Sequence, residues 1–261
     1  MPSVNPYDLF AKYYDQLHYN DFSLNTIHYI DDILAKLGFT LLEMDSLTGF
    51  MGTQILDVGC GTGTLSLWLG EQGYDVTAID LSKGMIQSAK QKAKKANLDI
   101  HFQNTDIRKL KFTSLFDLAL SIFDTMNHLT KYTDLQKAMK NIHKALKPKG
   151  YFLFDMITPY ELLTQWNHGI RYENNGNVSL LLHSNYHRKN RLAEISGKFV
   201  VRNGKRILTH TRQFYNKAYT RKEINSILRH SGFKLIHAYD CFTFNLPDRK
   251  SNRIFYITQK I

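Results

Sequence analysis

Short apolar runs and longer amphipathic stretches alternate through the middle of the chain. The apolar runs predict strands at 55–58, 76–80, 100–103, 116–122 and 151–156. The stretches between them have helical spacing and predict helices at 64–71, 82–96 and 133–146. Ser82 fits an N-cap, and Pro148 and Gly150 end the last of these helices. Strands that alternate with helices predict a parallel sheet covered by helices on both faces.

The two ends of the chain have different patterns. Residues 7–37 are helical in pattern and rich in tyrosine. Strand-like segments at 178–186, 192–201 and 206–215, joined by turns at 188–190 and at Asn203-Gly204, predict a three-stranded antiparallel insert. A capping box from Thr220 to Glu223 opens a helix that ends at Gly232. A final hairpin of strands at 235–240 and 254–258 is expected to close the parallel sheet at its edge.

Composition argues against several classes of protein. The longest apolar stretches, such as 116–123, are far shorter than the roughly 20 residues that a membrane span requires. Residues 1–10 lack the pattern of a signal peptide, and no Cys/His spacing is typical of a zinc site. Cys60 lies between two glycines, which argues against a disulfide with Cys241 and favours a reducing, cytoplasmic location. We therefore expect neither a membrane nor a metal as a partner.

Charge is distributed unevenly along the chain. Residues 1–159 contain 16 Lys and Arg and 17 Asp and Glu, whereas residues 160–261 contain 18 and 6. The basic part could face an acidic substrate or a nucleic acid, or it could form an ordinary solvated surface. The pattern leaves these interpretations open.

One short segment carries most of the functional information. Residues 55–63 read Ile-Leu-Asp-Val-Gly-Cys-Gly-Thr-Gly, a predicted strand followed by glycines at 59, 61 and 63 and then by a helix. Glycine is needed where a side chain would block a tight turn or the approach of a ligand. The free N–H groups at the start of the helix favour a polar or anionic ligand. The segment predicts a nucleotide-type site.

The spacing of the loop distinguishes between nucleotides. A dinucleotide fingerprint would place its third glycine at position 64, where this chain has Thr64. Asp57, at the end of the strand, would repel a diphosphate but not a ligand that carries an ammonium and a sulfonium group. These features favour S-adenosylmethionine over NAD.

Two further acids fit the same ligand. Asp80 ends the second predicted strand and could accept hydrogen bonds from both ribose hydroxyls. Asp106 follows the third strand and could accept from the adenine amino group, with Ile107 beside the ring. Leu81 and Met85 could supply apolar faces. Each acid alone could equally be a turn or cap residue; their recurrence at the ends of successive strands favours a ligand.

With these residues the chain resembles the class I S-adenosylmethionine-dependent methyltransferases, over roughly residues 50–158. Phe10-Ala-x-x-Tyr14-Asp15, Asp124-x-x-Asn127-x-Leu129 and Ala218-Tyr-Thr further resemble a bacterial small-molecule subgroup that includes aminosugar N,N-dimethyltransferases. The resemblance implies an antiparallel insert after the fifth strand. It also implies a cofactor-binding set that comprises Tyr14, Asp57, Gly59, Cys60, Gly61, Gly63, Asp80, Leu81, Met85, Asp106, Ile107 and Ser121.

The predicted fold class is therefore α/β. It consists of a Rossmann-like, seven-stranded, mostly parallel sheet with helices on both faces, and a three-stranded antiparallel insert after strand five. We expect four parts: an N-terminal helical cap (1–45), the S-adenosylmethionine-binding core (46–160), an antiparallel substrate lid (161–218) and a C-terminal part of the core (219–261).

The chemistry demands little of the protein beyond placement. An activated methyl donor requires that the acceptor be held in line with it, and a base is needed only if the acceptor must lose a proton. Asp124, Asn127 and His128 follow the fourth strand and are the predicted catalytic residues. Asp124 could instead be an N-cap, and His128 a surface histidine. The hydroxyl of Tyr14 could touch the cofactor or acceptor, or its ring could simply anchor the helix.

These features lead to three hypotheses. The first is a methyltransferase that acts on N or O of a small polar acceptor, which could be acidic or phosphorylated; a homodimer is compatible with it. The second is an RNA methyltransferase that uses the basic C-terminal part, although Ser121-Ile-Phe-Asp124 stands where an Asn-Pro-Pro-Tyr-type motif would be expected. The third is a non-catalytic protein that binds S-adenosylmethionine.

Overall fold

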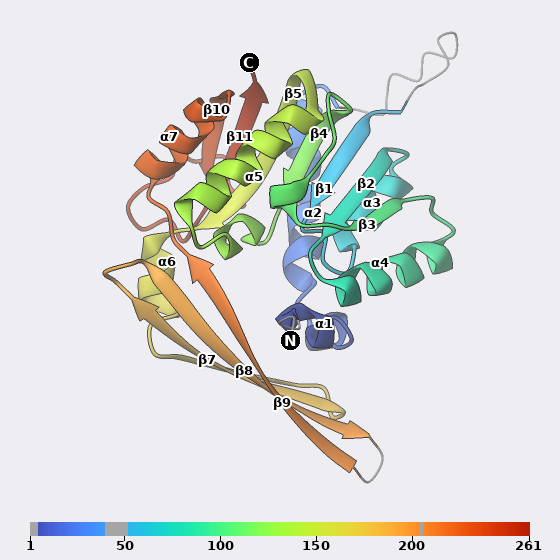
Figure 1. Ribbon diagram of the computed structural model, residues 1–261, viewed down its shortest axis with the longest axis vertical. Helices are drawn as coiled ribbons and strands as arrows, with labels where there is room; N and C mark the ends of the chain where they lie inside the picture. Colours follow the sequence, from blue (N-terminus) through green and yellow to red (C-terminus); the bar gives the residue numbers. More distant parts are fainter. Residues whose placement is uncertain (1–4, 40–51, 204–205) are drawn as a thin grey trace.

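The structure is a computed structural model that describes residues 5–39, 52–203 and 206–261. Within these ranges the chain forms two sheets (Figure 1). The expected boundary between residues 45 and 46 lies outside the described residues, and so does Gly204 of the predicted turn.

The larger sheet has seven strands in the order β10-β11-β5-β4-β1-β2-β3. Their bounds are β1 Gln54–Val58, β2 Asp75–Asp80, β3 His101–Asn104, β4 Phe116–Ser121, β5 Leu146–Ile157, β10 Phe233–Asp240 and β11 Arg253–Lys260. β11 runs antiparallel to both β5 and β10, and the other neighbours are parallel. The predicted seven-stranded, mostly parallel sheet and its closing hairpin are confirmed.

Helices cover both faces of this sheet, as predicted. On one face lie α2 (Asp21–Lys36), α3 (Thr64–Glu71) and α4 (Lys83–Ala96), which pack on Ile55 and its neighbours. On the other face lie α5 (Tyr132–Ala145) and α7 (Arg221–His230), whose buried side chains belong to the cluster that includes Leu56 and Val58. Because consecutive residues of a strand point to opposite faces, the apolar run of β1 is buried from both sides.

The N-terminal region is less regular than its pattern suggests. It consists of α1 (Pro6–Phe10), a 3-10 turn η1 (Asp15–Leu17) and α2. His18 follows η1 with a φ of 61°, in the left-handed region, and this residue interrupts the predicted continuous helix. The short first helix can therefore turn away from α2 and lie beside the smaller sheet (Figure 1).

The smaller sheet has four antiparallel strands, so the prediction of three was wrong. A short helix, α6 (Pro159–Gln165), leads into β6 Gly169–Asn174, β7 Val178–His187, β8 Leu192–Asn203 and β9 Arg206–Lys217. The missed strand, β6, is an edge strand whose Ile170 and Tyr172 are 70% and 60% exposed. It shows little alternation of buried and exposed positions because it borders solvent, and alternation was the signal that identified the other strands.

One face of the smaller sheet packs on the N-terminal region and on α6. Phe199 and Phe214 lie 5.3 and 6.1 Å from Phe10, measured between ring centroids. Leu17 of η1 and Leu162 of α6 belong to the same buried cluster. The sheet is therefore fixed to the elements beside the glycine loop, although it extends well beyond the larger sheet in Figure 1.

Among the described residues, no helix is long and apolar enough to cross a membrane. Cys60 and Cys241 are both free thiols.

We predict that Thr220→Ala lowers the free energy of unfolding by about 1 kcal/mol. Thr220 caps α7 by accepting a hydrogen bond from the backbone N–H of Glu223 at 3.3 Å, and Glu223 reciprocates on the N–H of Thr220. Urea denaturation measures the change. Lys222→Ala, on an exposed position of the same helix, is the control and should leave stability within about 0.5 kcal/mol. An equal effect of both changes would contradict the capping role.

Candidate functional site

The glycine loop leaves the end of β1 and turns sharply above the sheet. Gly59, Gly61 and Gly63 have φ values of 73°, 55° and 82°. The backbone N–H groups of Gly59 and Cys60 donate to the carbonyl of Ile79 in β2, at 2.8 and 3.0 Å. These bonds fix the loop to the two central strands.

Two of the loop glycines differ in what surrounds them. A Cβ atom at Gly59 would overlap the side chain of Thr125, in the loop after β4. A Cβ atom at Gly61 would meet no heavy atom within 4 Å. Gly59 is therefore required by packing inside the protein, whereas Gly61 borders open space that a ligand can enter.

Two acids flank this space at the ends of β1 and β2. Asp57 is buried and accepts a hydrogen bond of 2.5 Å from Ser66 in α3; burial raises the pKa of its carboxyl to about 7. Asp80 accepts from the N–H groups of Gly61 at 3.0 Å and Ser82 at 2.7 Å. Burial raises the pKa of Asp80 to about 6, even though these bonds favour the carboxylate. Each Asp80 oxygen keeps a lone pair for a further donor.

The other predicted cofactor residues have mixed surroundings. The carboxylate of Asp106 is paired with Arg108 at 2.7 Å, and this hydrogen bond lowers its pKa. Leu81 is 58% exposed, whereas Met85 is buried in α4. Ile107 packs on the core beside α5, and the Ser121 hydroxyl donates to the carbonyl of Val58 at 3.0 Å.

The thiol of Cys60 is half-buried beside the backbone of Gly61. Its sulfur lies 3.7 Å from the Gly61 carbonyl oxygen, and burial raises its pKa. A thiol with a raised pKa is a poor nucleophile, which agrees with its interpretation as a small packing residue.

The N-terminal region is tied directly to the loops after β1 and β2 by two acids: Asp15, which the sequence analysis named only as part of a motif, and Asp8, which it did not single out. Asp15 accepts from Thr62 of the glycine loop at 2.6 Å and pairs with Lys92 of α4 at 2.8 Å. Asp8 accepts from Ser82 at 2.7 Å and from the N–H of Gly84 at 3.0 Å. No local pattern could reveal these bonds, because their partners are 47 to 77 residues away in the chain.

Two tyrosines of the N-terminal region, Tyr14 and Tyr7, lie near the acids of this site. Tyr14 packs on Phe10 and Tyr19, at ring-centroid distances of 5.1 and 5.6 Å. Burial raises the pKa of Tyr14, and the negative charges of Asp124 and Asp80 raise it further. Tyr14 therefore belongs to the aromatic cluster of the N-terminal region, near enough to both acids for their charges to act on its hydroxyl.

Tyr7 makes the contact that the sequence did not predict. Its hydroxyl lies 3.1 Å from Nε2 of His128, and Nδ1 of His128 lies 3.1 Å from the carbonyl oxygen of Tyr215 in β9. A carbonyl can only accept, so Nδ1 carries a proton; in the neutral ring, Nε2 then accepts a hydrogen bond from the Tyr7 hydroxyl. The two contacts thus orient the ring of His128 with Nε2 toward Tyr7.

His128 ends a 3-10 turn, η3 (Thr125–His128), that follows β4. The two residues before the turn, Phe123 and Asp124, have φ values of 58° and 48°, which are unfavourable for residues with side chains. The Asn127 amide donates to the carbonyls of Ile157 and Lys217 and accepts from the N–H of Ile157. Asn127 therefore joins the end of β5 to the end of β9.

Asp124 is held by a buried ion pair rather than by capping η3. One carboxylate oxygen pairs with Arg253 at 2.9 Å, and the other accepts from Asn216 at 2.9 Å. Arg253 also pairs with Asp155, which accepts from the N–H of Asp124. The catalytic roles predicted for Asp124, Asn127 and His128 stay predictions; of these three, His128 has a ring nitrogen within hydrogen-bonding distance of a side-chain hydroxyl, that of Tyr7.

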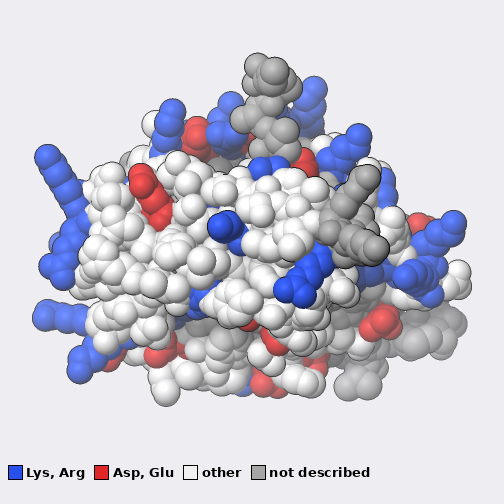
Figure 2. Space-filling view, turned by 90° about the horizontal axis from the view of Figure 1, so that it is seen from below, with Lys and Arg blue, Asp and Glu red and all other residues white. Residues whose placement is uncertain are grey.

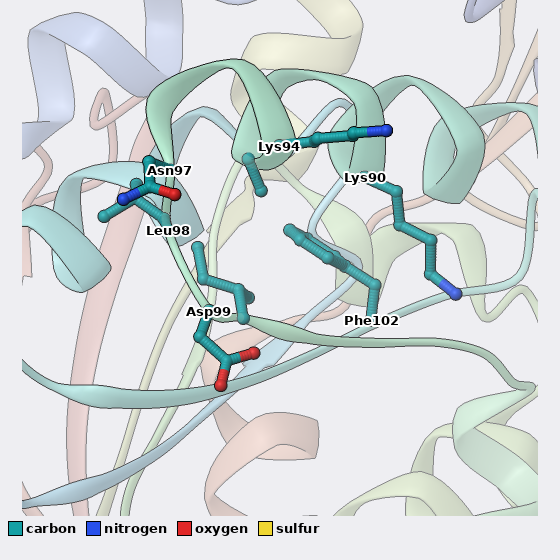
Figure 3. A pocket seen from close by; sticks show the side chains of 8 residues that line it. Lys90, Lys94, Asn97, Leu98, Asp99 and Phe102 are labelled. Atoms are coloured by element: carbon teal, nitrogen blue, oxygen red, sulfur yellow. The ribbon is translucent and has the colours of Figure 1, made fainter.

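A separate hollow lies at the other edge of the sheet. It has a volume of about 430 Å³ and lies between the end of α4 and the start of β3, lined by Lys90, Lys94, Asn97 and Asp99 among others (Figure 3). Asp99 precedes β3, whereas Asp106 follows it, so the hollow is remote from the glycine loop.

Comparisons with known proteins agree with this geometry. Residues 55–150 match a family model described as a methyltransferase domain. YqeM of Bacillus subtilis, which has a provisional methyltransferase name, is 29% identical over 209 residues, or 79% of this chain and 84% of that one. GWCH70_2453 of Geobacillus, also provisionally named a methyltransferase, is 27% identical over 256 residues, or 97% and 99% of the two chains.

Solved structures share the fold. An S-adenosylmethionine-dependent methyltransferase from Clostridium acetobutylicum superposes with a TM-score of 0.81 over 98% of this chain and 99% of that one, at 24% identity. CalS10 of Micromonospora echinaspora is described as an amino pentose methyltransferase with bound S-adenosylmethionine. It superposes with a TM-score of 0.67 over 90% of this chain and 91% of that one, at 16% identity.

The glycine loop, the sheet order and these relationships define an enzyme of one class. Residues 55–150 form a methyltransferase domain, and the chain is an S-adenosylmethionine-dependent methyltransferase with the class I fold. Its residues fit this cofactor: Gly61 borders open space, and Asp80 has oxygens available beside it.

We predict that Gly61→Ala weakens the binding of S-adenosylhomocysteine at least ~10-fold, because its methyl group would enter the space beside the loop. Isothermal titration calorimetry measures this. Gly176→Ala is a matched control, since Gly176 also has a positive φ and no heavy atom within 4 Å of its Cβ position. Both changes should cost about 1 kcal/mol of stability from backbone strain. Equal affinities for the two variants would contradict a ligand at Gly61.

We also predict that the ligand-free protein becomes less stable as pH rises from 4 to 7. The Asp57 carboxyl has a pKa of about 7 in the folded protein, whereas its ordinary pKa, expected in the unfolded chain, is 3.8, so the folded state binds more protons in this window. The free energy of unfolding falls by at most about 4 kcal/mol through this group. Asp57→Asn should flatten the profile in urea denaturation, whereas Asp75→Asn, exposed at the start of β2, should not. An unchanged slope in Asp57→Asn would show that another group causes it.

Proposed function

We propose that the enzyme transfers a methyl group to N or O of a small polar acceptor, which lies between the ends of β4 and β5 and the smaller sheet. The observation that supports this proposal most directly is the position of Thr125, in the turn after β4. This residue closes on Gly59 of the glycine loop, while His128, three residues later, reaches Tyr7 and β9. The space beside Gly61 and the elements of the smaller sheet therefore meet at one turn.

The proposed cofactor-binding residues come from β1, from the segments that follow β1 to β4 and from the N-terminal region. They are Tyr14, Asp57, Gly59, Cys60, Gly61, Gly63, Asp80, Leu81, Met85, Asp106, Ile107 and Ser121. The negative charges of Asp57 and Asp80 suit a ligand that carries an ammonium and a sulfonium group. Because the charge of Asp106 is balanced by Arg108, we assign it the more neutral adenine end of the ligand.

Bound S-adenosylmethionine supplies a methyl group that is already activated by a positively charged sulfur. The chain's own residues then have to hold the acceptor and remove its proton. The hydroxyl of Tyr7 can take that proton as it gives its own to Nε2 of His128, since the two atoms are 3.1 Å apart. Asp124 and Asn127 act as positioning residues, because their side chains fix the turn that carries His128.

We assign the four predicted parts of the chain to this scheme. Residues 1–45 cover the cofactor side, 46–160 bind the cofactor, 161–218 form a lid that selects the acceptor, and 219–261 complete the larger sheet. The bonds of Asp8 and Asp15 to the loops after β1 and β2 support the first assignment. The assignment of residues 46–160 rests on the glycine loop. That of residues 219–261 rests on β10 and β11, which lie at one edge of the larger sheet.

A small molecule is favoured over RNA as the acceptor. The amino pentose methyltransferase CalS10 shares the fold over most of both chains. Lys and Arg residues are frequent on the face seen in Figure 2, but most lie around its periphery and the centre is largely uncharged. A continuous basic track, which a nucleic-acid backbone would require, is absent from this face of the described residues.

We predict that the protein binds S-adenosylhomocysteine and that Asp80→Ala weakens this binding at least ~10-fold, because a charge-assisted acceptor is lost beside Gly61. Asp75→Ala, at the exposed opposite end of β2, should bind normally. Isothermal titration calorimetry measures both affinities. No binding by the unmodified protein would overturn the proposed function. Transfer of labelled methyl groups to RNA, and not to small molecules, would favour the RNA alternative.

A further inference from the structure

One short N-terminal segment, residues 7–15, contacts three of the loops at the carboxyl edge of the larger sheet. The contacts are Asp15 with Thr62 after β1, Asp8 with Ser82 after β2, and Tyr7 with His128 after β4. In Figure 1, α1 lies below this edge and above the distal part of the smaller sheet. Ligands of parallel sheets bind outside the carboxyl ends of the strands, so the segment lies along the ligand-binding edge.

Asp8 acts as a second cap for α4, supplied from another part of the chain. Its Oδ1 accepts from the Ser82 hydroxyl at 2.7 Å and from the N–H of Gly84 at 3.0 Å. Ser82 is itself the N-cap of α4, since its hydroxyl oxygen accepts from the N–H of Met85, and its own N–H donates to Asp80. Asp8 therefore fixes the residue that holds the Asp80 carboxylate in place.

The close approach of α1 to α4 requires glycine at position 84. A Cβ atom there would lie 2.6 Å from the carbonyl oxygen of Asp8 and 2.9 Å from its Cα. These are backbone atoms, which can move aside only if α1 itself shifts. The φ angle of Gly84 is not positive, so α4 alone would accept alanine, which helices favour over glycine. The docking of the N-terminal segment is therefore what requires this glycine.

Asp15 fastens the other end of the segment. One carboxylate oxygen accepts from the Thr62 hydroxyl at 2.6 Å, and the other pairs with Lys92 of α4 at 2.8 Å. Thr62 directly follows Gly61, which borders the open space beside the glycine loop. The carboxylate of Asp80 links the two fastened loops, because it accepts from the N–H of Gly61 and from that of the α4 N-cap. The segment thus bridges the loops on both sides of Asp80.

The two sides of the segment are held by different kinds of contact. Toward the loops after β1 and β2, the contacts described above are hydrogen bonds and an ion pair. Toward the smaller sheet, Phe10 lies in a buried apolar cluster with Phe199 and Phe214. Water can replace a broken hydrogen bond, whereas parting an apolar contact exposes apolar surface to water. The segment therefore separates more easily from the loops than from the smaller sheet.

We propose that Asp8 and Asp15 are positioning residues of the cofactor site. They fasten residues 7–15 across the ligand as a strap. The strap has to detach from the loops after β1 and β2 before S-adenosylmethionine can enter or S-adenosylhomocysteine can leave. The proposal rests on the cofactor-binding residues proposed above and adds to them a step that controls the exchange of the cofactor.

A strap of this kind leaves a kinetic signature. Weakening one fastening raises the fraction of molecules in which the strap is detached, so that a ligand both enters and leaves more quickly. Damage to the ligand-binding surface itself would speed dissociation without speeding association. The two rate constants together therefore distinguish a strap from a residue that only supports the fold.

Surface plasmon resonance on the immobilised full chain measures both rate constants for S-adenosylhomocysteine. Asp8→Ala should raise the dissociation rate about 10-fold, the usual contribution of hydrogen bonds to a charged group, and should not slow association. Asp8→Asn keeps an oxygen that can accept from Ser82 and Gly84, so its dissociation rate should stay within about threefold of the unmodified protein. Asp21→Ala, an exposed acid in the first turn of α2, is the control and should change neither rate.

Gly84→Ala tests the docking of the segment without changing a charge. Its methyl group would overlap the backbone of Asp8 and displace α1, so dissociation should again be about 10-fold faster. The variant should fold, because alanine suits α4. Lys83→Ala, at the neighbouring exposed position of the same helix, is the control and should exchange the ligand at the normal rate.

Hydrogen exchange gives a second readout in the unmodified protein. Tyr14, a proposed contact of the cofactor, belongs to the strap, so S-adenosylhomocysteine should slow the exchange of amides in residues 7–15, and less so in Gly84→Ala. Unchanged dissociation rates in both Asp8→Ala and Gly84→Ala would overturn the strap, and so would faster dissociation with slower association. Failure of the unmodified protein to bind S-adenosylhomocysteine would instead overturn the proposed function.

Discussion

The buried ion pair between Asp124 and Arg253 holds the turn on which the rest of the site depends. The backbone of Phe123 and Asp124 is left-handed, a conformation that residues with side chains adopt only when their surroundings impose it. Arg253 supplies that restraint from β11, more than 120 residues further along the chain. The turn then brings Thr125 against Gly59, and it joins β5 to β9 through Asn127.

The same turn connects parts of the molecule that would otherwise be independent. The larger sheet provides the glycine loop, and the smaller sheet contributes Asn216 and the carbonyl of Tyr215. The N-terminal region completes the arrangement, since Asp8 and Asp15 tie it to the loops after β2 and β1. These hydrogen bonds hold the larger sheet, the smaller sheet and the N-terminal region in one arrangement around the turn.

The site contains two acidic regions, which differ in whether a cation pairs with their carboxylates. Near the glycine loop, Asp57 is buried and Asp80 is half-buried; the pKa values of both are raised, and neither pairs with a cation in the part of the chain that the structure describes, a setting suited to a positively charged cofactor. Near β5, Arg253 pairs with both Asp124 and Asp155. The Tyr7–His128 contact lies at the turn after β4, and the carbonyl of Tyr215 orients the imidazole.

The sequence by itself determined the larger sheet and the cofactor loop, because both depend on local signals. Buried parallel strands require continuous apolar runs, and the turn from β1 into α3 requires glycines at fixed spacing. The same signals missed β6, whose edge position removes the alternation of buried and exposed side chains. Only the tertiary structure decided that Tyr7 meets His128 and that Arg253 meets Asp124 and Asp155. These partners are about 100 to 130 residues apart, and only the folded sheets bring them within hydrogen-bonding distance.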